Sequence, residues 1–500
     1  MTLGRNLIAG LANSIWSALI GLAVVPFYLK YLGMEAYGLI GFFATTQALL
    51  QLLDMGMAPT INREVARCSA SGDLKEAGKL LHTLAVVYWG MAAVIAVLIL
   101  ALAPFIAEYW LQSRQLSPEN IAHAVMLMGL VVACRWPIGL YQGALIGAQR
   151  LTVSSGINMM MVTLGSLGAI AVLAFVSPTI EAFFIWQACV GLVYAITMRT
   201  AAWRIIGKSK QNSFDIEKLK SVWRFTAGMS GIGLTALIFT QMDKVILSKM
   251  LGLEEFGHYM LATVVVSGLY VLVAPLFNVM YPRFSALVVT GETEKLEHLY
   301  RLGTRMLAAV LFPIAIALAL FSEDLVLIWT GNAVIASSVA PVIALLVFGS
   351  ALNGVMYFPY ALQLSYGMTW IPLAINTILM CFLVPLIIYL AKAYGAMGGA
   401  MAWLISEAVY VMLGPWLTHR YILKGLGPKW FFQDMGLPLV LSVTIGMIGH
   451  YAIQAAGFLP YEKLIGAAGL AIFTSTLILL MSRQLREIVR DYAKWKKCEI

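Results

Sequence analysis

The sequence is poor in charge. Only 11% of its 500 residues are Asp, Glu, Lys or Arg, against about 25% in an ordinary soluble domain. Hydrophobic residues make up 61% of the chain, which is more than one soluble core can bury, so the chain calls for lipid as its solvent. The scarcity of charge therefore argues against a soluble globular protein and predicts an integral membrane protein.

Motifs of nucleotide-driven and covalent chemistry are also missing. The chain has no Walker phosphate loop and no HExxH or GxSxG sequence. Its five cysteines have neither a metal-site spacing nor the even number of a disulfide framework. No stretch between the apolar spans is long enough to fold as an ATPase or glycosyltransferase domain. We therefore expect a protein that is not an enzyme and that holds no cofactor or metal.

Long apolar spans fill most of the chain. A span of about 20 apolar residues crosses a bilayer as one helix. We count fourteen such spans and expect an all-α integral membrane protein with about fourteen transmembrane helices. The spans are 7–29, 36–57, 81–109, 120–146, 152–175, 181–201, 225–247, 256–281, 305–329, 337–362, 370–391, 397–417, 433–455 and 463–482.

The basic residues lie mainly in alternate connections between these spans. One set of connections, with the residues outside the first and last spans, holds 26 of the 33 Lys and Arg residues. The opposite set holds only Lys30, Arg114, Lys249, Lys392 and Lys463. Cytoplasmic loops carry such an excess of positive charge. The net charge of +9 therefore reflects membrane topology rather than a nucleic-acid partner, and both termini are expected in the cytoplasm.

A nine-residue phrase occurs twice. Residues 30–38 read KYLGMEAYG, and residues 249–257 read KMLGLEEFG. Other matches keep nearly the same spacing: Gly72 with Gly291, Asn158 with Asn376, and Trp186 with Trp403. A long repeat of this kind is typical of transporters built from duplicated halves. The phrase therefore predicts two homologous lobes.

Six predicted spans separate the two copies, so both halves enter the membrane in the same direction. We expect two parallel six-helix lobes around a pseudo-twofold axis along the membrane normal, with a substrate site between them near mid-depth. Two further helices follow at the C-terminal end. The predicted segments are an N-terminal lobe 1–205, a cytoplasmic linker 206–221, a C-terminal lobe 222–420, helices 13 and 14 in 421–482, and a basic amphipathic cytoplasmic tail 483–500.

Two charged residues fall in the middle of predicted spans, where a charge is costly. Arg135, in ACRWPIG, is a candidate contact for an anionic head group because a guanidinium binds phosphate with two N–H groups. The alternative is a structural ion pair with a nearby acid. Glu407, in WLISEAVYVM, is a candidate for proton or cation coupling, and Gly191 takes its place in the first lobe. Its alternative role is a static partner of Arg135 or Lys244.

Further polar residues lie at membrane depth. Asp243 and Lys244 adjoin in one span, and successive helix residues point about 100° apart, so we expect them not to pair. Asp243 and Asp54 are weaker ion-coupling candidates, and Asp54 has a helix-capping role as its alternative. Asn158 and Asn376 occupy equivalent places and are candidates for binding sugar hydroxyls, although membrane asparagines also join helix to helix.

Several segments resemble one family. They are PFYLKYLGMEAYGL, LLDMGMAPTINREVAR and YQGALIGAQR in the first half, and MDKVILSKMLGLEEFGHY and YPRFSALVVTGE in the second. With them the chain resembles the Wzx-type polysaccharide (O-antigen) flippases for lipid-linked oligosaccharides. These belong to the multidrug/oligosaccharidyl-lipid/polysaccharide exporter superfamily.

The resemblance implies alternating access around a hydrated cavity in a bacterial inner membrane. The substrate would be an oligosaccharide on undecaprenyl diphosphate, an O-antigen or other exopolysaccharide unit, moved from the cytoplasmic to the outer leaflet. Arg135 and Lys244 would meet the diphosphate or acidic sugars, and the lipid tail would stay in the bilayer. Glu407 motivates the further expectation that a proton or sodium gradient drives the step, as in an antiporter. Polysaccharide polymerase and chain-length proteins are expected partners.

Alternative functions stay open at this point. One is a cation-coupled small-molecule or multidrug exporter of the same superfamily, although such a protein would want more buried acids. Another is a peptidoglycan-precursor flippase, whose arginines in the first helix have no counterpart in span 7–29. A membrane-embedded glycan polymerase or ligase fits poorly because the outer connections are short.

Overall fold

The fold is all-helical, as the sequence predicts. The computed structural model describes residues 2–54, 56–71, 74–207, 214–215, 235 and 237–481. Within these ranges, 11 helices are long and apolar enough to cross a membrane. The expected all-α, multi-pass membrane protein is thereby confirmed. Helices are favoured in lipid because a helix satisfies its own backbone hydrogen bonds.

Two of these helices each cover two predicted spans. Helix α1 (Thr2–Leu50) contains a non-helical Gly33 with φ 80°, and α15 (Trp370–Tyr421) contains a non-helical Gly395 with φ 57°. Positive φ is accessible to glycine because it has no Cβ. The predicted span 225–247 is described only at residue 235 and from residue 237 onward. The count of fourteen therefore stays a prediction.

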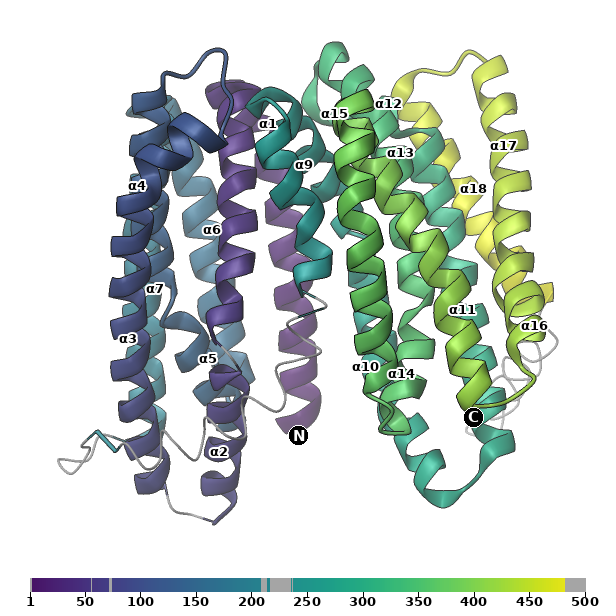
Figure 1. Ribbon diagram of the computed structural model, residues 1–500, viewed down its shortest axis with the longest axis horizontal. Coiled ribbons are helices and arrows are strands. Elements are labelled where there is room, and N and C mark those ends of the chain that lie inside the picture. Colours follow the sequence, from purple (N-terminus) through teal and green to yellow (C-terminus); the bar gives the residue numbers. More distant parts are fainter. Residues whose placement is uncertain are drawn as a thin grey trace, which may run out of the picture. The chain divides into compact units, whose positions relative to one another are not determined.

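The chain divides into two compact units, residues 1–257 and 258–500. The first unit contains long helices joined by shorter ones, and α1 packs against α6 while α4 packs against α3 and α7 (Figure 1). Its elements are α1, a 3-10 turn Gln51–Asp54, α2 (Met57–Ser71), α3 (Leu74–Phe105), a π-helical turn Ile106–Trp110, α4 (Pro118–Arg135), α5 (Ile138–Gly147), α6 (Leu151–Phe175), α7 (Ile180–Ile206), a helix over 237–250, and the first turn of α9 (Leu253–Ser267).

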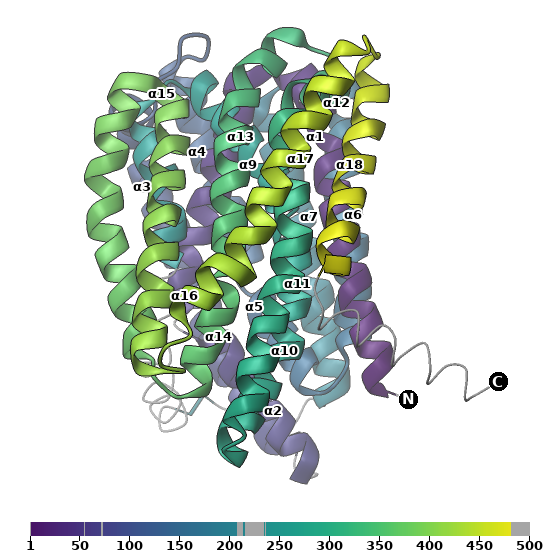
Figure 2. The ribbon, with the colours of Figure 1, turned by 90° about the vertical axis from the view of Figure 1, so that its right-hand side faces the viewer.

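In the second unit, α11 (Thr293–Leu320) is the central helix, and it packs against α10, α13, α17 and α18 (Figure 2). The remaining elements of this unit are the rest of α9 (258–267), α10 (Tyr270–Thr290), α12 (Ser322–Thr330), α13 (Ala333–Val355), α14 (Tyr357–Ser365), α15, α16 (Gly427–Lys429), a π-helical turn Trp430–Gly436, α17 (Leu437–Ala455) and α18 (Pro460–Met481). The tail 483–500 and most of the linker 206–221 lie outside the described residues, and the predicted lobe boundaries remain predictions.

The repeated phrase interrupts the helix in both copies, at Gly33 in the first and at residues 251–252 in the second. Within the first unit the two copies also contact each other reciprocally. A Cβ on Gly38 would lie 2.2 Å from the carbonyl oxygen of Leu253, and one on Gly257 would lie 2.7 Å from that of Met34. Since Met34 corresponds to Leu253 in the repeat, each glycine admits the matching carbonyl of the other copy.

A loop holds the first copy in place. The Glu35 carboxylate accepts hydrogen bonds from the Ser113 hydroxyl (2.5 Å) and from the backbone amides of Arg114 (3.0 Å), Gln115 (3.1 Å) and Leu116 (3.3 Å). The same loop reaches the second copy, because the Leu253 amide donates to the Gln112 carbonyl at 2.7 Å. A carboxylate surrounded by backbone N–H donors makes strong, charge-assisted bonds. The loop over 112–116 thus fastens both copies of the phrase.

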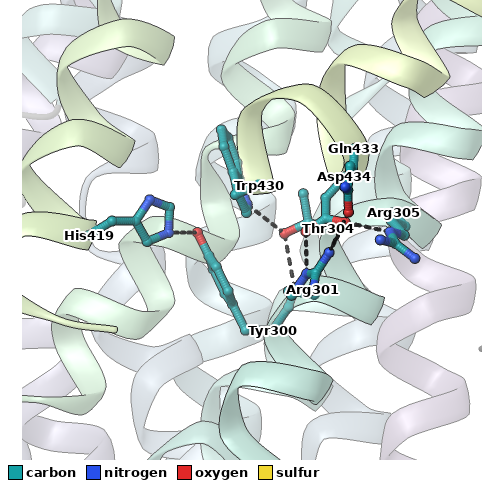
Figure 3. Close-up of polar contacts among 8 residues, drawn as sticks. All are labelled: Tyr300, Arg301, Thr304, Arg305, His419, Trp430, Gln433 and Asp434. Carbon is teal, nitrogen blue, oxygen red and sulfur yellow. Dashed lines mark hydrogen bonds and ion pairs between the residues drawn. The ribbon is translucent and has the colours of Figure 1, made fainter. Parts of the chain in front are cut away.

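In the second unit, a buried carboxylate joins α11 to the π-helical turn before α17 (Figure 3). Asp434 is fully buried and binds two arginines of α11. Arg301 donates from Nε to Asp434 Oδ2 at 2.8 Å and from Nη2 to Gln433 at 3.0 Å, and Arg305 also donates to Asp434. The helix begins at Thr293, so Arg301, expected in a connection, lies on α11 instead.

Neutral hydrogen bonds surround this cluster. Trp430 donates from Nε1 to the Thr304 hydroxyl at 3.1 Å, and the Tyr300 hydroxyl lies 3.2 Å from Nε2 of His419 near the end of α15 (Figure 3). Since α17 and α18 follow directly in the chain, these bonds fix the start of the two C-terminal helices to α11.

The close contact between the two copies of the phrase predicts a steric effect of Gly38→Ala. The new methyl would force the Leu253 carbonyl away, and overpacking of this kind costs about 1–3 kcal/mol. We expect a lower melting temperature for the purified protein in detergent. Gly90→Ala is the matched control, because no atom lies within 4 Å of its added Cβ and alanine favours a helix by up to about 1 kcal/mol. Equal melting temperatures for Gly38→Ala and the wild type would contradict the contact.

Asp434→Asn should destabilise the protein strongly. The amide keeps the shape of the carboxylate but removes the negative charge that Arg301 and Arg305 share, and breaking a buried ion pair in this way costs about 3–5 kcal/mol. A large fall in melting temperature is expected in detergent. Glu292→Gln removes the acid of the exposed Lys295 pair and serves as the control with little effect. A fall no larger than that of the control would show that the cluster does not hold α17.

Candidate functional site

Each unit contains a helix that stops and restarts at a corresponding place. In the first, α4 ends at Arg135 and α5 begins at Ile138; in the second, α13 ends at Val355 and α14 begins at Tyr357. The restart uses the same bond in both: Tyr141 donates its amide to the Pro137 carbonyl, and Tyr360, its equivalent in the repeat, donates to that of Met356. Helix breaks at membrane depth commonly line binding sites, and both breaks carry polar residues.

Arg135 lies in the last turn before the first break. Its Nη2 donates to Oε1 of Gln187 on α7 at 2.5 Å, and its guanidinium lies 6.0 Å from the centre of the Phe43 ring. Gly191 makes room for it, since a Cβ there would lie 3.1 Å from Cγ of Arg135. Among the described residues no carboxylate forms an ion pair with Arg135. The structural ion pair, given above as the alternative role of Arg135, is therefore not seen there, and one hydrogen bond to Gln187 leaves most of the guanidinium donors available.

Asn158 belongs to a polar network next to this arginine. Tyr194 of α7 donates to Asn158 Oδ1 at 2.7 Å, and Asn158 Nδ2 donates to Asn13 of α1 at 2.6 Å. The residue thus joins α1, α6 and α7, which is the helix-joining role given above as its alternative. Asn376 is partly exposed, and its side chain has no hydrogen bond within the part of the chain that the structure describes.

Glu407 is fully buried on α15 and reaches the second break. Asn353, in the last turn of α13, donates from Nδ2 to Glu407 Oε2 at 3.0 Å, and Tyr270 donates to Asn353 Oδ1 at 3.2 Å. Glu407 Oε1 has no partner in the described ranges, and no lysine or arginine there pairs with the carboxylate. With one hydrogen-bond donor and no cation, the free-energy cost of burying this carboxylate is only partly offset. Binding a proton or a small cation would reduce that cost.

The expectation that Asp243 and Lys244 do not pair is wrong. Lys244 Nζ lies 3.1 Å and 3.2 Å from the two carboxylate oxygens of Asp243 and also donates to the Thr240 carbonyl at 3.0 Å. Adjacent side chains leave the helix in different directions, but the long flexible lysine stem folds back far enough to meet its neighbour. Asp243 is only 2% exposed, so the charge of Lys244 is balanced locally.

Asp54 performs the capping role that was its alternative. Its Oδ2 accepts the backbone amide of Ala58 at 3.2 Å in the first turn of α2, and the Tyr88 hydroxyl donates to its other oxygen. These bonds tie the end of the 3-10 turn to α2 and α3.

The charged centres of the two breaks therefore differ in sign. The first unit presents an arginine without an acid, and the second presents a carboxylate without a base, each in the corresponding part of its own fold and each judged over the described residues. A chain that recognised one symmetric ligand would not need this difference. The arrangement instead suits an anionic group at one break and a proton or small cation at the other.

Comparison with known proteins decides the family. Residues 30–339, more than half of the chain, match the family described as polysaccharide biosynthesis protein. The chain belongs to this polysaccharide biosynthesis protein family. The resemblance carried by the sequence motifs is thereby confirmed, and the first helix break lies inside the matched segment, whereas the second lies beyond its end.

One relative of the chain is the succinoglycan biosynthesis transport protein ExoT of Rhizobium meliloti. The two are 24% identical over 441 residues, which cover 83% of each chain. Among solved structures, the lipid II flippase MurJ in an inward closed conformation has a TM-score of 0.70 at 13% identity and covers 97% of this chain and 99% of its own.

An inward-facing MATE family multidrug resistance transporter has a TM-score of 0.65 at 14% identity and covers 83% of this chain and 99% of its own. Identities this low show the fold alone.

Sequence reasoning missed several polar contacts. Asp434 falls at the edge of a predicted span, where an acidic side chain is expected to lie at the membrane surface in contact with water. Glu35 stands in the repeated phrase, which was a usable signal, but its partners lie in a distant loop. Asn353 was not singled out, although the spacing that relates Asn158 to Asn376 also relates Arg135 to Asn353.

Proposed function

We propose that this protein is a flippase that moves a polyprenyl-diphosphate-linked oligosaccharide from the cytoplasmic to the outer leaflet of a bacterial inner membrane. The glycan is an O-antigen or other exopolysaccharide repeat unit, the termini lie in the cytoplasm, and no covalent chemistry is performed. The family, the transport role of the relative ExoT and the MurJ-like fold support this function. A polysaccharide polymerase is the expected consumer of the product.

The observation that carries the proposal is Arg135. It is an arginine within an apolar span, beside a helix break, without an acidic partner among the described residues. Placing it there is costly, and its bond to Gln187 orients the guanidinium without neutralising it. A diphosphate supplies the missing negative charge and the planar pairs of acceptor oxygens that a guanidinium prefers. Lys244 is already paired with Asp243, so Arg135 is the principal contact.

Glu407 is the proposed coupling residue, with a proton or sodium as the driving ion. Only Asn353 holds it within the described chain, and its second oxygen has no partner there. A proton or a bound cation would relieve the cost of burying this carboxylate. Loss of the ion would raise that cost and favour a different packing of α13 against α15, which is the kind of two-state change that alternating access requires.

Arg135→Ala should abolish most transport. Losing a charged hydrogen-bonding group costs about 1.5–3 kcal/mol, or roughly 10- to 150-fold in substrate affinity. The measurement is surface polysaccharide in a strain that lacks its own flippase for this glycan and carries the variant. Arg135→Lys should retain part of the activity, and Arg199→Ala on the exposed side of α7 is the control. Full complementation by Arg135→Ala would contradict the diphosphate contact.

Glu407→Gln should uncouple transport from the ion gradient. The amide keeps an acceptor oxygen for Asn353 but can no longer gain or lose a proton. In proteoliposomes with an imposed pH or sodium gradient, wild-type flux should follow the gradient and variant flux should not. Glu119→Gln, at an exposed acid of α4, serves as the control. If the variant retained the same gradient dependence, the coupling role of Glu407 would have to be abandoned.

A further inference from the structure

Five aromatic side chains form a continuous track on one side of the second unit. Tyr270, Phe277 and Tyr281 come from α10, and Tyr357 and Tyr360 come from α14, which lies beside it (Figures 1 and 2). We call these five residues the aromatic track. From Tyr270 to Tyr281 the track extends about 16 Å along α10, at about 1.5 Å per residue. It is therefore elongated rather than a single pocket.

The rings of the track are ordered by one another. Phe277 stacks on Tyr281, with centroids 5.7 Å apart and planes at 9°, and on Tyr360, at 6.0 Å and 16°. Tyr357 meets Phe277 edge to face at 5.8 Å. Such packing fixes the rings, so a ligand that stacks on the outer faces of the pile would lose little entropy in ordering them.

The track is polar as well as aromatic. All five residues are partly exposed, and the hydroxyls of Tyr281, Tyr357 and Tyr360 make no hydrogen bond within the described ranges. A hydroxyl turned toward hydrocarbon without a partner is costly. These three groups therefore favour water or a polar ligand over lipid as their neighbour.

The track also adjoins the buried pair at the second helix break. The Tyr270 hydroxyl donates to Asn353, which in turn donates to Glu407. The carboxylate is fully buried behind these residues, and its Oε1 has no partner in the described part of the chain. A ligand on the track would thus lie next to the coupling residue without touching its charge.

Four of the five corresponding positions in the first unit are not aromatic. The counterparts at the spacing of the repeated phrase are Gln51, Ala58, Asn62, Ile138 and Tyr141. Only the last is aromatic, and it is 1% exposed. The duplicated fold therefore does not need these rings for packing. They are a property of the second unit alone, just as the unpaired arginine is a property of the first among the described residues.

From these observations we propose that the aromatic track binds the sugar part of the substrate and not its diphosphate. A pyranose ring presents a face of C–H groups that stacks on an aromatic ring, and its hydroxyls bond to phenol and amide groups at the edge. A diphosphate would be repelled by the nearby carboxylate. The inference rests on the proposed function and specifies which residues recognise the glycan.

The test compares two ligands on the same protein. Native mass spectrometry of the purified full-length protein measures the binding of bare undecaprenyl diphosphate and of the glycosylated carrier extracted from cells that lack this protein. The wild type should prefer the glycosylated carrier. Phe277→Leu, Tyr281→Leu and Tyr360→Leu should each reduce that preference about 2- to 10-fold, the range expected for one ring contact, and leave binding of the bare carrier unchanged.

Matched variants separate this proposal from the proposed function. Tyr281→Phe keeps the ring and should lose less than Tyr281→Leu, whereas Phe473→Leu, at a ring of α18 that is 60% exposed, should change nothing. Arg135→Ala should weaken both ligands equally. An unchanged preference in the three leucine variants, or no preference in the wild type, overturns the sugar site alone. Retained binding of both ligands by Arg135→Ala counts against the diphosphate contact instead.

Discussion

Inside a bilayer no water reaches the backbone, so a helix that stops within the membrane leaves N–H and C=O groups for the protein itself to satisfy. In this chain the two corresponding breaks, after α4 and after α13, leave few such groups. Pro137 has no N–H to satisfy, and the helical bonding resumes at once through Tyr141 and Tyr360. The breaks are therefore tolerable in lipid. In the last helical turn before each break, one polar side chain bonds to a neighbouring helix: Arg135 to Gln187 of α7, and Asn353 to Glu407 of α15.

The two halves share an interrupted helix at corresponding positions, and they differ in the charged side chain at that break: Arg135 in the first and Glu407 in the second. The same architecture carries an arginine at one break and an asparagine–glutamate pair at the other, and the aromatic track lies beside the second. The two halves share the arrangement of helices around the break, and substitution at a few positions gives each break different polar side chains.

Much of the fold was predictable because a chain segment that crosses lipid must satisfy its own backbone hydrogen bonds, which leaves few possible structures. Apolar spans of sufficient length became helices, and the repeated phrase marked the helix interruption in both copies. The limits of sequence reasoning appear where a contact depends on side-chain reach or on rotation about a helix axis. Lys244 bends back to Asp243, which spacing alone argued against, and Asp434 binds two arginines from a helix far earlier in the chain.

The candidate site was predicted in part for the same reason. Arg135 and Glu407 stood out because charge is rare at membrane depth, so one residue carries a readable signal. The tyrosines of α10 and α14 did not stand out, because the chain has 21 tyrosines. Only the orientation of each helix about its axis shows which of them lie together on one face.

The position of Gly33 has a mechanical meaning. Two residues after it, Glu35 is tied to the loop over 112–116, so the helix beyond the glycine moves only if that loop moves as well. The stretch before the glycine carries no such tie to the loop. Gly33 therefore divides α1 into two stretches with different attachments: the second is held by the loop, and the first is held by α6, where Trp16 donates to the Thr163 hydroxyl at 2.9 Å and Tyr28 donates to the Ser166 carbonyl at 3.3 Å.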